Sequence, residues 1–411
     1  MVLKLFRRAK KNPDYKKRIS ERFGFSPFKL KNSIWIHSVS MGESIAIAPL
    51  VKKLIAGNPE TPFVVTTMTP TGSVQVQKLY QEYDQVHHCY LPYDLSYLMA
   101  FFIRRINPMM LVIMETELWP SLLHSCKTKH IPVILTNARL SEKSAKGYQK
   151  ISFIMKHMLN DIAYISAQST ADEARFKKLG IAADKISTTG NLKYDLSITP
   201  AQKELGSEFK KSFGQRPIWI AASTHEGEDE IILKAHQLLL EEQPNTLLIL
   251  VPRHPERFQQ VYQLAESNNF KTQKRSKSID IDPTTQVLLG DSMGELMAYY
   301  FASDIAFVGG SLINHGGHNL LEPASLGKPS LSGPHTFNFE AITRLLAEQE
   351  ATLIVGNEIE LSKQLIALYK TPAFYQKMSD NALKVIAENQ GALDKQHAIS
   401  QNILNQKSHA K

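Results

Sequence analysis

The stretch SIWIHSVSMGESIAIAPLVKKLI, residues 33–55, holds the pattern from which the fold is predicted. Its apolar run 34–37 has the length and side-chain types of a buried strand. After a polar turn, apolar side chains recur at three- and four-residue spacing, as in an amphipathic helix: Ile47, Leu50, Val51, Leu54 and Ile55. A strand followed by a helix, repeated along a chain, predicts a parallel sheet covered by helices on both faces.

This alternation runs through most of the chain and is interrupted once, at the turn-rich segment GNLKYDLSITP, residues 190–200. The strands expected before the break are 34–37, 63–67, 110–114, 133–136, 164–167 and 186–189. Those expected after it are 218–222, 247–251, 287–289, 305–308, 329–332 and 353–355. We therefore predict an α/β protein of two Rossmann-like, doubly wound domains that face each other across a cleft. The expected divisions are a basic segment 1–31, a domain 32–190, a linker 191–200, a second domain 201–370 and C-terminal helices 371–411.

Composition and charge exclude several classes of protein. With 411 residues, 43% hydrophobic and 21% charged, the chain is neither disordered nor fibrous. The two cysteines, Cys89 and Cys126, cannot form a disulfide framework or a cysteine-rich zinc module. The whole net charge of +9 lies in residues 1–31, where eleven basic residues stand against Asp14 and Glu21.

Such a basic segment, which begins with Val2, Leu3, Leu5 and Phe6, is typical of a peptide attracted to an anionic membrane surface. A solvated arm without a partner is the alternative. We expect no nucleic-acid partner, because the cations are not spread over a folded face among aromatic side chains. No apolar run is long enough to span a bilayer, and no signal peptide is recognisable.

Motifs at the predicted strand ends of the first half supply candidate catalytic and acceptor-binding residues. Glu43 follows Gly42 at the end of the first strand, where a carboxylate can take a proton from an acceptor hydroxyl. Ser40 and Glu43 equally fit a helix capping box, which is a structural alternative. Gly42 is the first candidate for contact with an acceptor, because a glycine lets a substrate approach. The remaining candidates lie at the next strand ends: Thr71, Glu115, Glu117, Arg139 and Lys143. For Arg139, an ion pair with one of the glutamates is the structural alternative.

The second half carries residues suited to a nucleotide. Hydroxyls and the imidazole in Ser223-Thr224-His225 can hold a phosphate, and Arg253 beside Pro252 offers a rigid fork of donors. Paired glycines in the segment 309–317 allow a ligand to approach the backbone at Gly310 and Ser311. A helix expected from about His318 would bring Asn319 and Glu322 to the ribose of a nucleotide-sugar donor.

One motif supports a different class of enzyme. Gly290-Asp-Ser292-Met-Gly294 matches the G-x-S-x-G elbow of a serine hydrolase, with Ser292 as the nucleophile. The alternative is that backbone N–H groups near Met293 and Gly294 face a nucleotide. A non-catalytic module that tethers lipid or binds nucleic acid through the basic segment is a third hypothesis. We expect no metal site and no cofactor, since Asp280-Ile-Asp282 lies in a polar loop and not at a strand end.

At these residues the chain resembles the 3-deoxy-D-manno-octulosonic acid (Kdo) transferases of Gram-negative bacteria. The matching segments run from His37 to about Phe339 and include HSVSMGE, TTMTPTG, METELWP, NARLS, STHEGE, LVPRHPERF, GDSMGEL, GGHNLLEPA and GPHTFNF. The resemblance implies a GT-B glycosyltransferase that moves Kdo from CMP-Kdo to a lipid A precursor with inversion. A UDP-sugar transferase or epimerase of the same fold is the alternative within this architecture.

The resemblance also implies roles for individual residues. Glu43 matches the general base of the family. Its CMP contacts match Pro252, Arg253, Met293, Gly294, Glu295, Asn319, Leu320, Leu321 and Glu322. The family commonly begins with an apolar anchor, whereas this sequence starts in the basic segment, so we expect either a removed anchor or peripheral attachment. The expected location is the cytoplasmic face of the inner membrane, with its anionic surface as a partner.

Overall fold

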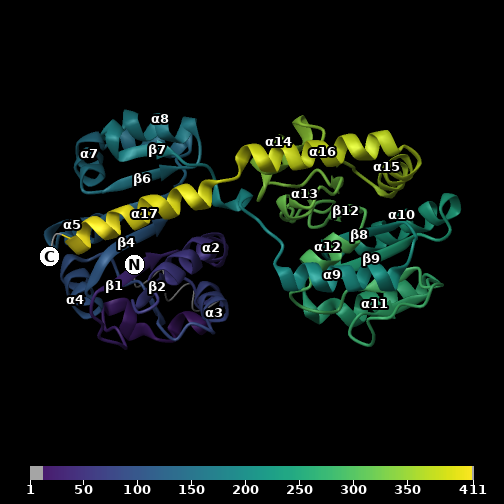
Figure 1. The fold of residues 1–411 in the computed structure, drawn as a ribbon, viewed down its shortest axis with the longest axis horizontal. Helices are drawn as coiled ribbons and strands as arrows, with labels where there is room; N and C mark the ends of the chain where they lie inside the picture. The colour runs from purple at the N-terminus through teal and green to yellow at the C-terminus, as the bar shows by residue number, and fades with distance from the viewer. Residues whose placement is uncertain (1–12, 410–411) are drawn as a thin grey trace. The chain divides into compact units, whose positions relative to one another are not determined.

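The structure, a computed structural model, describes residues 13–409. The chain divides into two compact units (Figure 1): unit 1 comprises Met1–Asp195 and Gln390–Lys411, and unit 2 comprises Leu196–Asn389. The division falls inside the range 191–200 that was expected to be a linker. The C-terminal residues are shared between the two units, a feature that the sequence pattern does not indicate.

Unit 1 is a seven-stranded parallel sheet with strand order β3-β2-β1-β4-β5-β6-β7. Its strands are β1 (Ser33–His37), β2 (Phe63–Thr67), β3 (Val86–Tyr90), β4 (Pro108–Met114), β5 (Val133–Ala138), β6 (Tyr164–Ala167) and β7 (Ile186–Thr188). Its α-helices are α2 (Met41–Gly57), α3 (Pro70–Leu79), α4 (Ser96–Ile106), α5 (Pro120–Thr128), α6 (Glu142–Gln149), α7 (Ser152–Asn160), α8 (Thr170–Lys178) and α17 (Ala392–His409). Short 3₁₀ helices are η1 (Pro13–Lys16), η2 (Ile19–Phe23), η3 (Ala183–Lys185) and η4 (Leu192–Tyr194).

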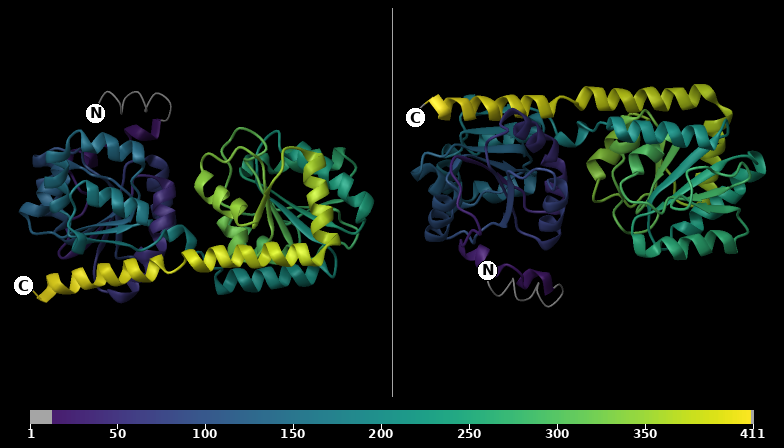
Figure 2. Two further views of the ribbon diagram at one scale, coloured as in Figure 1. Left: turned by 90° about the horizontal axis from the view of Figure 1, so that it is seen from above. Right: turned by 60° about the horizontal axis from the view of Figure 1, so that its bottom comes forward.

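Unit 2 repeats this architecture with strand order β10-β11-β9-β8-β12-β13-β14, again with parallel pairing. Its strands are β8 (Ile218–Thr224), β9 (Leu247–Pro252), β10 (Thr272–Lys274), β11 (Val287–Leu289), β12 (Ile305–Val308), β13 (Ser330–Ser332) and β14 (Thr352–Ile354). Its helices are α9 (Pro200–Phe213), α10 (Asp229–Glu242), η5 (Pro255–Arg257), α11 (Phe258–Ser267), α12 (Leu296–Ala302), α13 (Leu321–Ser325), α14 (Glu340–Glu348), α15 (Glu358–Lys370) and α16 (Pro372–Asn389). Figure 2 shows helices on both sides of the sheet in each unit.

The packing of the cores explains why the strands could be predicted from the sequence. Each sheet is buried on both faces by apolar side chains, so its central strands are nearly continuous apolar runs. Every predicted strand is present, within a residue or two of its expected ends. Two edge strands were missed: β3 contains the polar pair His87 and His88, and β10 has no apolar side chain.

Part of the basic segment belongs to the folded unit. The expected membrane-proximal segment 1–31 overlaps the described residues from Pro13, and its cations Lys4, Arg7, Arg8, Lys10 and Lys11 lie outside them. Arg22 is only 2% exposed; its guanidinium donates to the Met68 carbonyl and lies over the Tyr90 ring. Arg18 pairs with Glu21 and donates to the His88 carbonyl. These two cations therefore hold η2 against β3, and they are not free to meet lipid. None of the helices within residues 13–409 is both long and apolar enough to cross a bilayer.

Helix α17 returns the C-terminus to unit 1, where it packs on α2 and β4 (Figure 1). The Asp195 carboxylate accepts the N–H groups of Gly391 and Leu393, both at 2.7 Å, and so caps the start of this helix. Further along the helix, the Gln396 amide donates to the Thr189 hydroxyl at 3.0 Å. Polar contacts from one helix thus tie the chain end to the end of β7.

We expect Asp195→Ala to lower the free energy of unfolding of unit 1 by about 1–2 kcal/mol, since two N–H groups at a helix start lose their acceptor. Asp184→Ala, an exposed change in the same unit, is the control. Urea unfolding followed by circular dichroism measures both. Equal stability of the two variants would contradict a capping role for Asp195.

Candidate active site

Glu43 lies in the first turn of α2, directly after β1, and is half-buried. One carboxylate oxygen accepts the Val39 N–H at 2.8 Å, and the other accepts the Ser40 hydroxyl at 2.8 Å. The Ser40 hydroxyl in turn accepts the Glu43 N–H, so the cap expected from the sequence is formed. The capping interaction and the exposed edge of the carboxylate coexist, and the two interpretations of this motif do not exclude each other.

Two further carboxylates act on Glu43 from the end of β4. Burial raises the pKa of Glu43, the Val39 and Ser40 hydrogen bonds oppose this, and the charges of Glu115 and Glu117 raise it further. Burial likewise raises the pKa of Glu117, although its hydrogen bond from the Trp119 indole at 2.9 Å lowers it. Glu115 has a left-handed backbone with φ of +59°, a strained conformation for a non-glycine residue.

A polar pocket of about 220 Å³ adjoins this group. It is lined by Glu115, Thr116, Glu117, Arg139, Leu140, Ser141, Ser144 and Tyr148. The ion pair considered for Arg139 does not form, since no carboxylate of the described residues lies within ion-pair distance of its guanidinium. Arg139 is an exposed cation with its donors available to a ligand.

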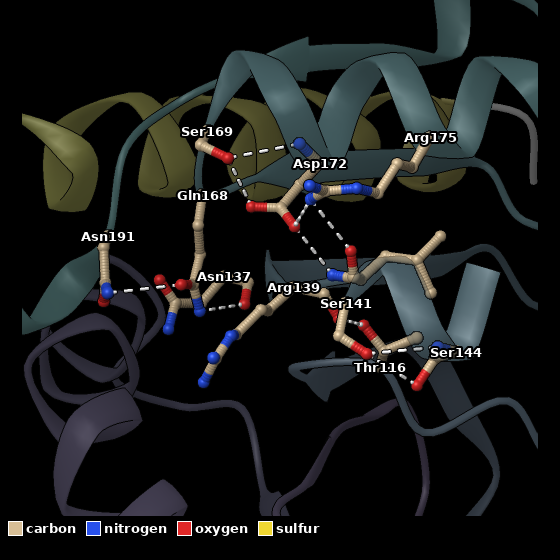
Figure 3. A network of polar contacts seen from close by, with 11 residues as sticks. Thr116, Asn137, Arg139, Ser141, Ser144, Gln168, Ser169, Asp172, Arg175 and Asn191 are labelled. Atoms are coloured by element: carbon tan, nitrogen blue, oxygen red, sulfur yellow. Dashed lines mark hydrogen bonds and ion pairs between the residues drawn. The ribbon is translucent and has the colours of Figure 1, made fainter. Parts of the chain in front are cut away.

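The backbone that carries Arg139 is held firmly, as Figure 3 shows. The neighbouring Leu140 N–H donates to Asp172 at 2.8 Å, and the Leu140 carbonyl accepts from Arg175 at 3.1 Å. The Thr116 hydroxyl donates to the Arg139 carbonyl. In Figure 3 the Arg139 side chain itself extends away from this network.

The other predicted acceptor residues lie near this edge of the sheet. Gly42 is exposed, and a Cβ added there would meet no atom of the protein within 4 Å, so the packing of unit 1 does not require a glycine at this position. Thr71 is exposed at the start of α3. Lys143 is exposed on α6, directly before the pocket residue Ser144. The structure brings Glu43, Glu115 and Glu117 together, with Arg139 in the adjoining pocket.

In unit 2 the predicted nucleotide residues lie at the carboxyl ends of four neighbouring strands. Ser223 is partly exposed at a bulge of β8 and has φ of +58°. Arg253 is exposed after β9, where its N–H donates to the Thr224 carbonyl at 3.0 Å. Met293 is 60% exposed after β11, and Gly294 beside it has φ of +89° with open space around it. These positions are available to a ligand.

Backbone N–H groups of the glycine-rich loop after β12 already donate to a carboxylate of the protein itself. Glu228 is fully buried, and its carboxylate accepts the N–H groups of His225, Gly310, Ser311 and Leu312 at 2.6–3.0 Å. The N–H groups of Gly310 and Ser311 are therefore not available to the sugar donor, and contact with it through other atoms of these residues stays a prediction. The Ser311 hydroxyl is also used internally, since it donates to the Val308 carbonyl and accepts the Gly333 N–H.

Several other predicted contacts are buried or internally paired. Thr224, Leu320 and Leu321 are fully buried, and the Thr224 hydroxyl donates to Asp229 at 2.6 Å. These three side chains are not placed to touch a ligand. The Glu295 carboxylate pairs with Arg275 at 3.0 Å, which leaves its backbone as the part available for binding.

Around Glu322 the structure differs from the sequence prediction. The helix expected from about His318 begins at Leu321 and spans five residues, because residues 315–320 form an irregular loop. Asn319 is partly exposed and its side chain accepts the Leu321 N–H at 3.2 Å. Burial raises the pKa of Glu322 to about 7, against opposing effects of Asn319 and Arg253. Glu322 is thus suited to both accept and donate hydrogen bonds near neutral pH.

The serine hydrolase hypothesis is wrong in its geometry. The Ser292 hydroxyl donates to Glu295 at 2.5 Å and lies 2.8 Å from the Tyr299 hydroxyl. No histidine accepts from it among the described residues, so it has no base of the kind a nucleophilic serine requires.

Three histidines lie beside the glycine loop. The sequence predicted a phosphate contact for the imidazole of His225, and left His315 and His318 unassigned. His225 and His318 approach to 2.8 Å between their Nε2 atoms, and the His315 ring centroid lies 3.8 Å from that of His225. The HGGHN spacing and the STH motif were visible in the sequence. Their convergence, however, depends on a loop conformation that only the structure shows.

Comparison with known proteins agrees with this geometry. Residues 17–196 match the family model described as 3-deoxy-D-manno-octulosonic-acid transferase (kdotransferase), and residues 215–385 match that of the glycosyl transferases group 1. UDP-GlcNAc 2-epimerase from Neisseria meningitidis is 16% identical, covering 87% of this chain and 99% of that one with a TM-score of 0.56. At that identity the likeness shows the fold alone. The two units define a glycosyltransferase of the GT-B class.

Curated relatives identify the family. The 3-deoxy-D-manno-octulosonic acid transferase of Haemophilus influenzae is 44% identical over 94% of this chain and 91% of its own length. That of Bordetella pertussis is 33% identical over 89% of this chain and 86% of its own. The chain belongs to the Kdo transferase family and is a Kdo glycosyltransferase.

We expect Glu228→Gln to destabilise unit 2 by about 2–4 kcal/mol. An amide nitrogen would replace one accepting oxygen, and the backbone N–H groups facing it would lose their partner at about 1–3 kcal/mol each. Glu226→Gln, an exposed change two residues away, is the matched control. Thermal unfolding distinguishes them; a Glu228→Gln protein as stable as the control would show that the loop does not depend on this carboxylate.

Proposed function

We propose that this Kdo transferase moves Kdo from CMP-Kdo to a hydroxyl of a lipid A precursor, with inversion, as a step of lipopolysaccharide assembly. The observation that carries the proposal is the Glu43 carboxylate, half-buried at the carboxyl edge of the sheet beside a pocket with an unpaired cation. Its raised pKa makes it a better proton acceptor than an ordinary surface glutamate.

The chemistry follows from these residues. Glu43 accepts the proton of the acceptor hydroxyl while the oxygen forms a bond to the anomeric carbon of Kdo. The bond from that carbon to the CMP phosphate breaks, and CMP leaves with the electron pair. Arg253 is exposed beside the glycine loop and can neutralise charge that develops on the phosphate. We propose that the reaction needs neither a metal ion nor a cofactor.

The acceptor is a phosphorylated lipid, and unit 1 offers features that suit it. Arg139 and Lys143 supply cations near the polar pocket. On the outer face of α4, Tyr97 is 70% exposed beside Phe25 and Arg104, around a second, largely apolar pocket. The opposite face of α4 is buried in the core of unit 1. We propose that this surface meets the anionic cytoplasmic face of the inner membrane.

We expect Glu43→Gln to lower kcat about 100-fold or more, because the amide cannot accept the hydroxyl proton. Its affinity for CMP should persist, and its unfolding temperature should change little, because the amide still caps α2. Mass spectrometry of the lipid after incubation with CMP-Kdo and a tetraacylated precursor, in buffer with EDTA, measures the transfer and the number of Kdo groups added.

Glu360→Gln is the matched control for this experiment, since Glu360 is also a first-turn glutamate that accepts a backbone N–H. It should keep full activity. Transfer by Glu43→Gln at near the control rate would rule out Glu43 as the base, and loss of all transfer in EDTA would overturn the metal-free reaction.

The pH dependence tests the carboxylate group. The charge of Glu115 raises the pKa of Glu43, so Glu115→Gln should lower that pKa and keep Glu43 ionised at lower pH. The acid limb of kcat against pH should therefore move to lower pH. Glu142→Gln, which changes an exposed carboxylate paired with Lys146, should leave the limb in place. A shift of the Glu115→Gln limb toward higher pH would contradict the assignment.

A further inference from the structure

Unit 2 contains a cluster of imidazoles that the reaction described above does not use. His225 follows β8, whereas His315 and His318 lie in the loop after β12; they converge beside Arg253 and His254. The strands β8 and β12 are neighbours at the centre of the sheet, where strand order reverses and ligands bind in folds of this kind.

The geometry of the central pair fixes its protonation. The Nε2 atoms of His225 and His318 lie 2.8 Å apart, with ring planes within 5° of parallel. One ring must donate from Nε2 and the other must accept there, so the acceptor ring carries its proton on Nδ1. The donating ring can gain a proton on its own Nδ1 without losing this hydrogen bond. A second added proton would place two N–H groups face to face, so the pair holds at most one positive charge.

The surroundings keep the free pair uncharged. Burial lowers the pKa of His225 to about 4 and that of His318 to about 3, and the positive charge of Arg253 lowers both further. The groups that act on the pair are Arg253, His254 and Arg257 from the β9 end and His315 from the loop after β12. The carboxylates nearby are Glu228, which accepts the His225 N–H, Asp229 beside Arg257, and Glu322, on which Arg253 also acts. Glu228 is engaged with backbone N–H groups and Asp229 with Arg257.

We propose that His225, His315 and His318 form an anion-binding cluster for the phosphate of the sugar donor, and that the cluster takes up one proton from the solvent when that phosphate binds. Because the N–H groups of Gly310, Ser311 and Leu312 already donate to Glu228, the phosphate must find its donors elsewhere. The rings of His225 and His318 lie directly beside Gly310. The inference rests on the proposed use of CMP-Kdo. Proton uptake then adds a positive charge where the leaving group becomes more negative.

Calorimetric titration tests the uptake directly. The probe is the methyl phosphodiester of CMP, which does not itself titrate near neutral pH. At about pH 6, in buffers of different ionisation enthalpy, we expect the intact enzyme to take up a measurable fraction of a proton, at most about one, for each ligand bound. A phosphate close to an imidazole raises its pKa by about 1–3 units, and a rise at the upper end of this range charges a substantial fraction of the pairs at this pH. Affinity should accordingly rise as the pH is lowered from about 8 to about 6.

His318→Gln keeps a hydrogen-bonding side chain but cannot titrate, and it should bind the probe more weakly and with at least a twofold smaller uptake. His315→Gln, an exposed change, should weaken binding without unfolding the protein. His335→Gln, also exposed in unit 2, is the control and should retain the uptake of the intact enzyme. Binding without proton uptake by the intact enzyme, or full uptake by His318→Gln, would overturn the proposal. Failure of the intact enzyme to bind the probe at all would instead count against the CMP donor site.

Discussion

The carboxyl ends of parallel strands meet at one edge of a sheet, and in both units the strand order reverses at a central strand. Successive connections therefore leave in opposite directions between β1 and β4, and again between β8 and β12. That constraint leaves a crevice open at each reversal. Glu43 and Glu115 follow the two strands at the first reversal, and His225 and Gly310 follow those at the second.

Buried carboxylates shape the loops at these edges. The Glu228 carboxylate accepts N–H groups of the glycine loop, and the Asp172 carboxylate accepts the N–H group of the residue that follows Arg139. Both are 6% exposed or less, and each is satisfied by several donors, as a buried anion must be. Glu43 differs in keeping part of its carboxylate accessible while it caps α2. A residue that caps and also accepts a proton has a defined position, which is what general base catalysis requires.

The sequence predicted the architecture well because strands buried on both faces are apolar throughout, as in 110–114 and 247–251. It could not reveal β10, where Thr272, Gln273 and Lys274 pair through backbone alone. The position of Glu43 directly after a strand could be predicted, since it depends only on neighbouring residues in the sequence. The sequence could not reveal that the N–H groups of Gly310 and Ser311 are already paired, because their partner, Glu228, lies about eighty residues earlier in the chain. Long-range pairing of this kind leaves no local pattern.

The two units carry opposite chemical characters, and each suits one half of a displacement. Glu43, Glu115 and Glu117 make the unit 1 edge acidic, which favours removal of a proton from an alcohol and disfavours binding of an anionic nucleotide there. Arg253 and the imidazoles of unit 2 suit an anion instead. We propose that the His225–His318 pair is uncharged while no ligand is bound, so it does not repel Arg253. The pair becomes positively charged only when a bound anion stabilises that charge. Under the two proposals made above, affinity for the nucleotide is linked to the proton concentration, whereas deprotonation of the acceptor requires that Glu43 is ionised. The two requirements oppose each other in pH, so the enzyme should work best in the range where Glu43 has lost its proton and the occupied histidine pair has kept one.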